Sequence, residues 1–110
     1  MKSKELKEIL VSTPEHVIVI DVREPDEFAE APLLFDHRGY YNLPLGLVCS
    51  LPKEELIARL EEVAGKSNKT LDDVTLVVSC RSGGRSSLAQ ERLRAHGVEV
   101  ENLEGGYLGW

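Results

Sequence analysis

The hydrophobic positions of this chain alternate between short continuous runs and helical spacing. Continuous apolar runs at 17–20 and 75–79 are rich in β-branched residues, as is typical of strands covered on both faces. Apolar residues with helical spacing occur at 3–10, from 52 to 65 and from 86 to 96. This order of elements predicts an α/β fold with a mainly parallel central sheet flanked by helices.

The ends of the expected helices are marked by capping and breaking residues. Ser3 is expected to cap the first helix, Pro52 to begin the second and Gly65 to end it. The third is expected to stop at Gly97. The positions expected to face the core are Leu6, Ile9 and Leu10 in the first helix, Leu56, Ile57, Leu60 and Val63 in the second, and Ala89 and Leu93 in the third.

The remaining segments give weaker patterns. Pro25 is expected to start a turn or short helix that runs through Phe28. Residues 31–52 are rich in proline and glycine and are predicted to be rich in loop. Residues 66–73 read as a polar connection, and 98–101 alternate apolar and acidic residues in the manner of an edge strand.

Size and charge restrict the classes of function. With 110 residues and 12.2 kDa, the chain is expected to form one domain, residues 1–110. The net charge of -6 argues against nucleic acid or an anionic membrane as a partner. A charged N-terminus without an apolar core predicts no targeting segment, and no stretch reaches membrane-spanning length. We therefore expect a cytoplasmic protein whose two cysteines, Cys49 and Cys80, are free thiols.

The most informative segment is residues 80–86, which directly follows the second predicted strand. It reads Cys80-Arg81-Ser82-Gly83-Gly84-Arg85-Ser86. Glycines allow a tight loop whose N–H groups all point inward, and the helix that follows adds the positive end of its dipole. A cysteine held there is expected to have a lowered pKa and to react as a thiolate. The segment therefore predicts sulfur chemistry on an anion.

Two other interpretations of the loop compete with this one. Cys80 could be an inert core residue before a glycine turn, but that leaves the two arginines and two serines unexplained. A cysteine phosphatase or arsenate reductase also seats a thiolate below N–H donors. The phosphatase signature needs five residues between cysteine and arginine, whereas here four intervene before Arg85 and Ser86 occupies the arginine position. The shorter loop suits a single sulfur atom better than a phosphate.

Across nearly the whole chain, the sequence resembles the single-domain rhodaneses, a sulfurtransferase family. The matching segments are residues 80–86, Leu93-Arg94-Ala95-His96-Gly97, the run Asn102-Leu103-Glu104-Gly105-Gly106-Tyr107-Leu108-Gly109-Trp110, the first helix, 17–27 with its Asp-Val-Arg-Glu, and Asn42-Leu43-Pro44-Leu45. The sequence departs from the family at 31–41, which is longer than its counterpart and keeps only Gly39 clearly in place. Relatives also usually continue beyond Trp110 through a short helix.

The resemblance implies a mechanism and roles for the loop residues. The Cys80 thiolate would take the outer sulfur of an anionic donor such as thiosulfate and then pass it, as a persulfide, to a thiol acceptor that is a small molecule or a protein. The N–H groups of residues 81–85 would stabilise the sulfur. Arg81 would steer the donor, Arg85 would brace the loop, and Ser82 and Ser86 would supply hydroxyl donors. No metal or organic cofactor is implied, and the chain is expected to act as a monomer.

Two alternatives remain open at this point. The domain could carry a persulfide or recognise a partner without turning over small donors, and oxyanion chemistry is the less favoured second possibility. Asp21 and Arg23 are expected to form a structural ion pair at the end of the first strand. Cys49, among apolar neighbours, is expected to be at least partly buried. The histidines show no metal-ligand spacing; of these, His37 lies in the altered segment.

Overall fold

A computed structural model describes residues 1–34 and 37–110 of the chain. Its centre is a four-stranded sheet in the order β2-β1-β3-β4, in which every neighbouring pair is parallel. The strands are β1 (Val17–Asp21), β2 (Tyr40–Asn42), β3 (Thr75–Ser79) and β4 (Glu101–Asn102). Asp21 pairs with Ser79 in register, so the carboxyl ends of the two central strands meet at one edge of the sheet. The predicted fold class is confirmed.

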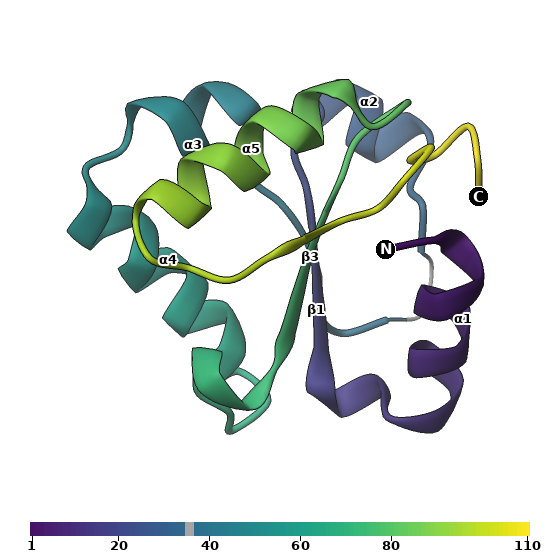
Figure 1. Ribbon diagram of the computed structural model, residues 1–110, viewed down its shortest axis with the longest axis horizontal. Coiled ribbons are helices and arrows are strands. Elements are labelled where there is room, and N and C mark those ends of the chain that lie inside the picture. The colour runs from purple at the N-terminus through teal and green to yellow at the C-terminus, as the bar shows by residue number, and fades with distance from the viewer. Residues whose placement is uncertain (35–36) are drawn as a thin grey trace.

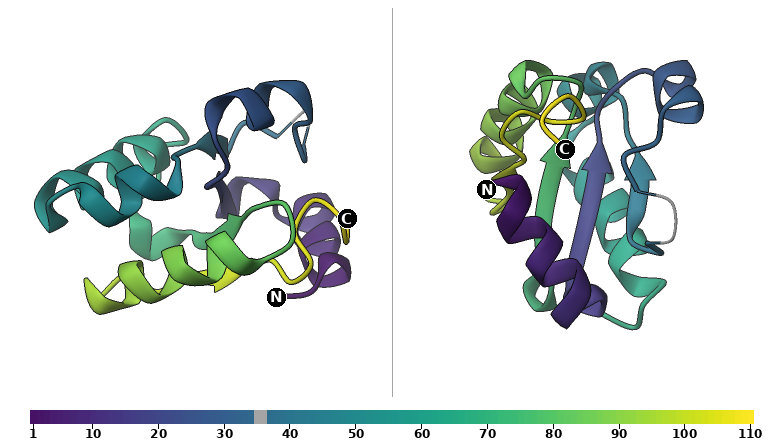
Figure 2. Two further views of the ribbon diagram at one scale, coloured as in Figure 1. Left: turned by 90° about the horizontal axis from the view of Figure 1, so that it is seen from above. Right: turned by 90° about the vertical axis from the view of Figure 1, so that its right-hand side faces the viewer.

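Helices cover both faces of this sheet (Figures 1 and 2). Helix α1 (Ser3–Ser12) packs on one face, where Leu6 contacts a cluster that contains Val17, Val19 and Val77. The opposite face carries α3 (Leu45–Ser50), α4 (Lys53–Gly65) and α5 (Gly84–Ala95). Helix α2 (Pro25–Glu30) follows β1, and two short 3₁₀ turns, η1 (Pro14–His16) and η2 (Leu71–Asp73), precede β1 and β3.

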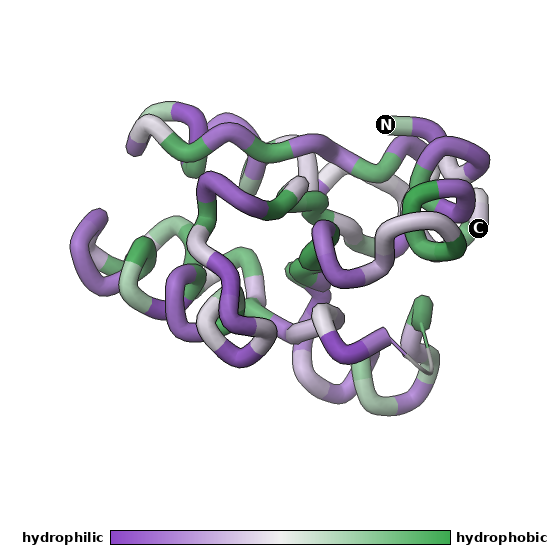
Figure 3. Tube along the Cα trace, turned by 90° about the horizontal axis from the view of Figure 1, so that it is seen from below, coloured by the Kyte–Doolittle hydropathy of each residue, from purple (hydrophilic) through white to green (hydrophobic). Residues whose placement is uncertain are grey.

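The strands are buried because every position of β1 faces a helical layer. All five residues of β1 are buried, and so are the last four of β3. The even-numbered positions of β1 join the cluster under α3, α4 and α5, and its odd-numbered valines join the cluster under α1. In Figure 3, hydrophobic positions lie in the middle of the trace, with hydrophilic positions mostly around them. The continuous apolar runs are therefore two-sided strands, as predicted.

Segment 31–52 is rich in loop, as predicted, but it also contains two elements that the sequence did not predict, strand β2 and helix α3. Strand β2 is only three residues long, and it forms because the edge of β1 offers unpaired backbone groups that it satisfies. Such a strand is stabilised by its neighbour and leaves no periodic signal in its own sequence.

Three element boundaries also differ from the sequence prediction. Ser3 is the first residue of α1 and not its cap, and its hydroxyl donates instead to the carbonyl of Gly109 at 3.1 Å. Helix α5 begins at Gly84, two residues earlier than expected, because Gly83 adopts a left-handed φ of 106° that turns the chain into the helix. The last strand is Glu101–Asn102 and not 98–101.

The expected core positions are buried, with four partial exceptions. Leu6, Leu56, Leu60, Ala89 and Leu93 are buried. Ile9, Leu10 and Val63 are partly buried residues that pack against the core, and Ile57 is also only partly buried. The buried residues of α4 are Leu56, Leu60 and Ala64, which are four positions apart and lie on the face of the helix that packs against the sheet.

Candidate active site

Cys80 lies directly after β3, at the carboxyl edge of the sheet where ligands bind in folds of this type. The residue is buried, with 2% of its surface exposed. Its Sγ accepts a hydrogen bond from the N–H of Gly83 at 3.0 Å and lies 3.3 Å from the hydroxyl of Ser86. The N–H groups of Ser82 and Ser86 also act on the sulfur. We call residues 80–86 the active loop.

The donors of the active loop arise from the way the chain enters α5. The first-turn N–H groups of a helix have no partner within the helix, and Ser86 is the third residue of α5. Its N–H is therefore available to the sulfur, together with the positive end of the helix dipole. The sequence predicts N–H donors from residues 81–85. Within this range the N–H of Gly83 bonds to the sulfur, and the N–H groups of Ser82 and Ser86 also lower the pKa of the thiol.

The pKa of the Cys80 thiol is the balance of opposing effects. Burial raises it, while the Ser86 hydroxyl and the N–H groups of Ser86, Gly83 and Ser82 lower it. The hydrogen bonds outweigh burial, so the pKa lies below the usual value for cysteine. A buried thiol surrounded by donors is thus set up to hold a negative sulfur atom.

The Ser86 hydroxyl is shared between the sulfur and Asn102. Its Oγ is fully buried and lies 2.5 Å from Oδ1 of Asn102, closer than it is to Cys80. The side-chain amide of Asn102 also donates to the carbonyl of Gly83 at 3.4 Å. Asn102 therefore connects β4 to the active loop. The sequence analysis gave Asn102 no role in the site, because the contact joins residues 16 positions apart.

Arg85 forms a two-pronged ion pair with Glu27 of α2. The two nitrogen–oxygen distances are 2.7 and 2.9 Å, and Oε1 of Glu27 also accepts the N–H of Glu24 at 3.1 Å. The hydrogen bonds from Arg85 and Glu24 lower the pKa of Glu27 to about 2. Sequence reasoning did not pair these residues, although Glu24 and Glu27 have the spacing of a capping box at the start of a helix.

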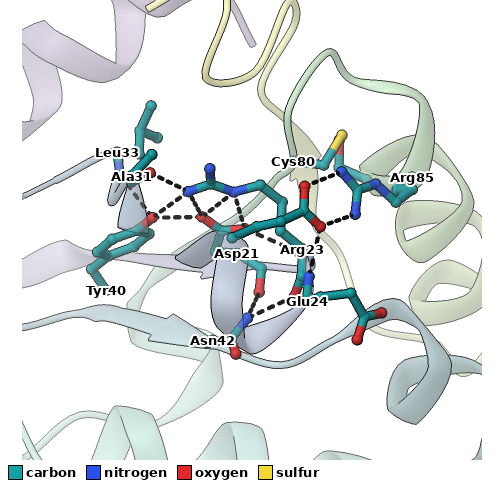
Figure 4. A network of polar contacts seen from close by, with 11 residues as sticks. Asp21, Arg23, Glu24, Ala31, Leu33, Tyr40, Asn42, Cys80 and Arg85 are labelled. Carbon is teal, nitrogen blue, oxygen red and sulfur yellow. Dashed lines mark hydrogen bonds and ion pairs between the residues drawn. The ribbon is translucent and has the colours of Figure 1, made fainter. Parts of the chain in front are cut away.

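Asp21 and Arg23 form a buried ion pair beside the loop (Figure 4), with 1% and 3% of their surfaces exposed. Nη2 of Arg23 lies 2.8 Å from Oδ2 of Asp21 and donates to the carbonyl of Ala31 at 2.7 Å. The hydroxyl of Tyr40 donates to Asp21 at 2.5 Å. Burial and this bond raise the pKa of Tyr40 to about 12. Asp21 and Arg23 thus form the structural ion pair expected from the sequence.

The C-terminal turn, residues 104–109, packs directly against the active loop. The N–H of Tyr107 donates to the carbonyl of Cys80, and that of Leu108 to the carbonyl of Arg81, both at 2.9 Å. A side chain on Gly106 would overlap the Cys80 carbonyl. The guanidinium of Arg23 lies 5.1 Å from the centre of the Tyr107 ring. The C-terminal turn therefore supports the active loop through two backbone hydrogen bonds.

A pocket of about 250 Å³ opens beside the loop. It is lined by Arg23, Glu27, Glu30, Ala31, Arg81, Tyr107 and Leu108. Arg81 is exposed, and no ion pair joins it to any residue within 1–34 or 37–110. The side chain of Ser82 is also exposed, so Ser82 contributes its backbone N–H to the sulfur. Arg81 thus lines the pocket, Ser82, Gly83 and Ser86 act on the sulfur, Arg85 pairs with Glu27, and Gly84 begins α5.

Other candidate residues lie away from the sulfur. Cys49 is exposed on α3, so the expectation of a buried thiol was wrong; Val48 takes the buried face of that short helix instead. His37 lies near the amino end of β1, where its Nε2 is 3.0 Å from the carbonyl of Val17. Part of segment 31–41, residues 35 and 36, lies outside the described residues. Tyr40 belongs to the Asp21 network, and Tyr41 packs against the core.

Within residues 1–34 and 37–110, every helix is too short or too polar to span a membrane. In the same residues, no group of three or more His, Cys, Asp or Glu side chains is placed to hold a metal ion.

Comparison with known proteins identifies the family to which this fold belongs. The sequence profile of the Rhodanese-like domain matches residues 2–110. A Schizosaccharomyces pombe protein named "Putative thiosulfate sulfurtransferase, mitochondrial" is 35% identical over 97 residues, which are 84% of this chain and 62% of that protein. The chain thus spans less than two thirds of this relative.

Solved structures agree with the profile. The human single-domain sulfurtransferase TSTD1 superposes with a TM-score of 0.71 at 24% identity, over 100% of this chain and 92% of that one. The reduced CoADR-RHD of Bacillus anthracis is 29% identical, with a TM-score of 0.64, over 98% of this chain and 15% of that one. By profile, sequence and fold together, the chain belongs to the rhodanese-like domain family.

Proposed function

We propose that this chain is a sulfurtransferase that carries sulfane sulfur on Cys80. The observation that supports the proposal best is the placement of a buried Cys80 sulfur among the donors of the active loop, which give the thiol a lowered pKa. Such donors stabilise a negative sulfur atom, whether it is the thiolate or the outer sulfur of a persulfide. The family and the name of the S. pombe relative point to the same chemistry.

The proposed reaction has two displacement steps. In the first, the Cys80 thiolate attacks the outer sulfur of the donor, a new S–S bond forms, and the old bond to that sulfur breaks. Thiosulfate would release sulfite, and a persulfide donor would release its thiolate. In the second step, an acceptor thiolate attacks the outer sulfur of the Cys80 persulfide and restores the Cys80 thiolate. Electrons balance in each step without an oxidant, and the kinetics should be ping-pong.

The remaining roles follow from position. Arg81, exposed at the pocket, would steer the anionic donor. Arg85 would brace the loop through Glu27, and Ser82, Gly83 and Ser86 would hold the transferred sulfur. The proposal needs a small anionic sulfur donor and a thiol acceptor, and no organic cofactor or metal. It also takes residues 1–110 as one domain that works as a monomer in a reducing compartment such as the cytoplasm.

The direct test is the intact mass of the protein after incubation with thiosulfate or with a persulfide. We expect the gain of one sulfur atom, its removal by a reductant, and no gain in a Cys80→Ser variant. A Cys49→Ser variant is the matched control, because Cys49 is the exposed thiol and should leave the gain intact. No gain from either donor would contradict the proposal, and turnover of an aryl phosphate or arsenate would then favour oxyanion chemistry.

A further inference from the structure

The charges around Cys80 are balanced almost completely by acidic side chains. Three guanidinium groups approach the pocket or loop, and three carboxylates lie among them. These are Arg23, Arg81 and Arg85 against Asp21, Glu27 and Glu30. Because these charges cancel, the pocket beside the active loop has little net attraction for a doubly charged anion. The active loop itself, however, is arranged to stabilise a negative sulfur atom.

We propose that Glu27 is a selectivity residue that neutralises Arg85 and thereby favours singly charged persulfide donors over doubly charged thiosulfate. The inference rests on the proposed function, since it concerns the donor for the same sulfur. It assigns to Glu27 an effect on the charge of the site in addition to its contact with Arg85.

The geometry of the pair supports a fixed charge at this position. Both oxygens of Glu27 accept from Arg85, and the N–H of Glu24 holds Oε1 from the other side. Because the pKa of Glu27 is lowered to about 2, its carboxylate is ionised throughout the neutral range and compensates Arg85 there. Arg85 in turn is close enough to Cys80 for the charge of the sulfur to act on its pKa, after the larger effects of Glu27 and burial.

The effect of the Glu27 charge on the reaction of Cys80 depends on the charge of the donor. A unit charge added beside the sulfur acts twice as strongly on a dianion as on a monoanion at the same distance. Removing the negative charge of Glu27 should therefore help thiosulfate more than a persulfide of an uncharged thiol. It should also help a negatively charged alkylating reagent more than a neutral one, and that comparison does not depend on sulfur transfer.

The first experiment compares alkylation of Cys80 by iodoacetate and by iodoacetamide in a Cys49→Ser background. Both reagents consume the same thiolate, so the ratio of their rates cancels any change in the thiolate fraction. We expect Glu27→Gln to raise the iodoacetate-to-iodoacetamide ratio about threefold. The double variant Glu27→Gln with Arg85→Gln removes both charges and should return the ratio to its native value.

Glu55→Gln is the matched control. Glu55 also pairs with an arginine, Arg59, but on the exposed surface of α4 at 3.7 Å. Its loss changes the net charge by the same amount, so the ratio should stay within the error of the native value. An unchanged ratio in Glu27→Gln, or a ratio that does not return in the double variant, would overturn the proposal.

The second experiment measures kcat/KM for thiosulfate and for the persulfide of 2-mercaptoethanol. Glu27→Gln should raise the preference for thiosulfate about threefold, because the two donors differ by one unit charge as the two alkylating reagents do, whereas equal losses on both donors would mean that Glu27 acts only in shaping the loop. If the native protein takes sulfur from neither donor, the proposed function fails. The alkylation ratio then still decides whether Glu27 sets the charge at Cys80.

Discussion

Gly106 lies against the carbonyl of Cys80 so closely that no side chain fits between them. Its φ of 52° also falls in the left-handed region that favours glycine. The contact matters because the next residue, Tyr107, donates its N–H to the same carbonyl. The backbone of Cys80 is therefore held by the C-terminal turn as well as by β3.

Replacing Gly106 by alanine should lower the free energy of unfolding by about 2–4 kcal/mol, because the methyl group forces either the turn or the active loop to move. Chemical denaturation measures this loss. The control is Gly65→Ala, since Gly65 ends α4 with open space around it and should lose less than about 0.5 kcal/mol. If the two variants had equal free energies of unfolding, the close contact between Gly106 and the Cys80 carbonyl would be contradicted.

Ser86 should lower the pKa of Cys80 measurably. Among the groups that lower the pKa of Cys80 against the effect of burial, the Ser86 hydroxyl has the largest effect. Ser86→Ala should therefore raise this pKa by about one unit. The pH profile of Cys80 alkylation by iodoacetamide, in a Cys49→Ser background, reports the change. Below both pKa values, the rate should fall about tenfold, because less of the thiol is ionised.

Ser87→Ala provides the comparison for this experiment. Ser87 is the next residue of α5, is exposed, and should leave the midpoint of the alkylation profile unchanged. A midpoint that also stays constant in Ser86→Ala would mean that the hydroxyl bonds only to Asn102, which is its nearer neighbour.

Much of the fold follows from local sequence patterns. The two central strands are continuous apolar runs, α1 and α4 have apolar residues at helical spacing, and Cys80 with its glycines marks the end of β3. What could not be predicted depends on tertiary contacts. Strand β2 is recognisable only beside β1, and the exposure of Cys49 depends on which face α3 turns toward the core.

The same reasoning applies to the candidate site. Residues 80–86 are contiguous, so their sequence predicts a shared loop. Glu27 lies 58 positions from Arg85, and Asn102 lies 16 positions from Ser86. Nothing in the local pattern of either residue specifies its partner. The interactions that position the loop therefore emerge only when α2, α5 and β4 are assembled around the sheet.

The buried ion pair of Asp21 and Arg23 should be costly to break. Asp21→Asn would leave the guanidinium of Arg23 uncompensated in a site where 3% of its surface is exposed, and such a loss typically costs about 3–5 kcal/mol. Thermal or urea denaturation at neutral pH measures this. Glu55→Gln, which breaks an exposed pair with Arg59, should cost about 0–0.5 kcal/mol. Similar losses in the two variants would show that burial of the pair has no effect.

Arg81 should affect donor capture more than the chemical step. Its side chain is exposed at the pocket beside the sulfur, so Arg81→Ala should raise KM for thiosulfate about five- to tenfold and leave kcat within about twofold. The difference from the native protein should shrink in 0.5 M salt, where exposed charges are screened over about 4 Å.

The control for Arg81 is another arginine of the same segment. Arg92 lies in the last turn of α5, where it complements the helix dipole, and Arg92→Ala should leave KM unchanged. Both variants remove one positive charge, so a rise in KM shared by the two would mean that net charge attracts the donor. A fall in kcat confined to Arg81→Ala would instead assign Arg81 to the transfer step, because only a group that acts in the transition state lowers kcat without changing binding.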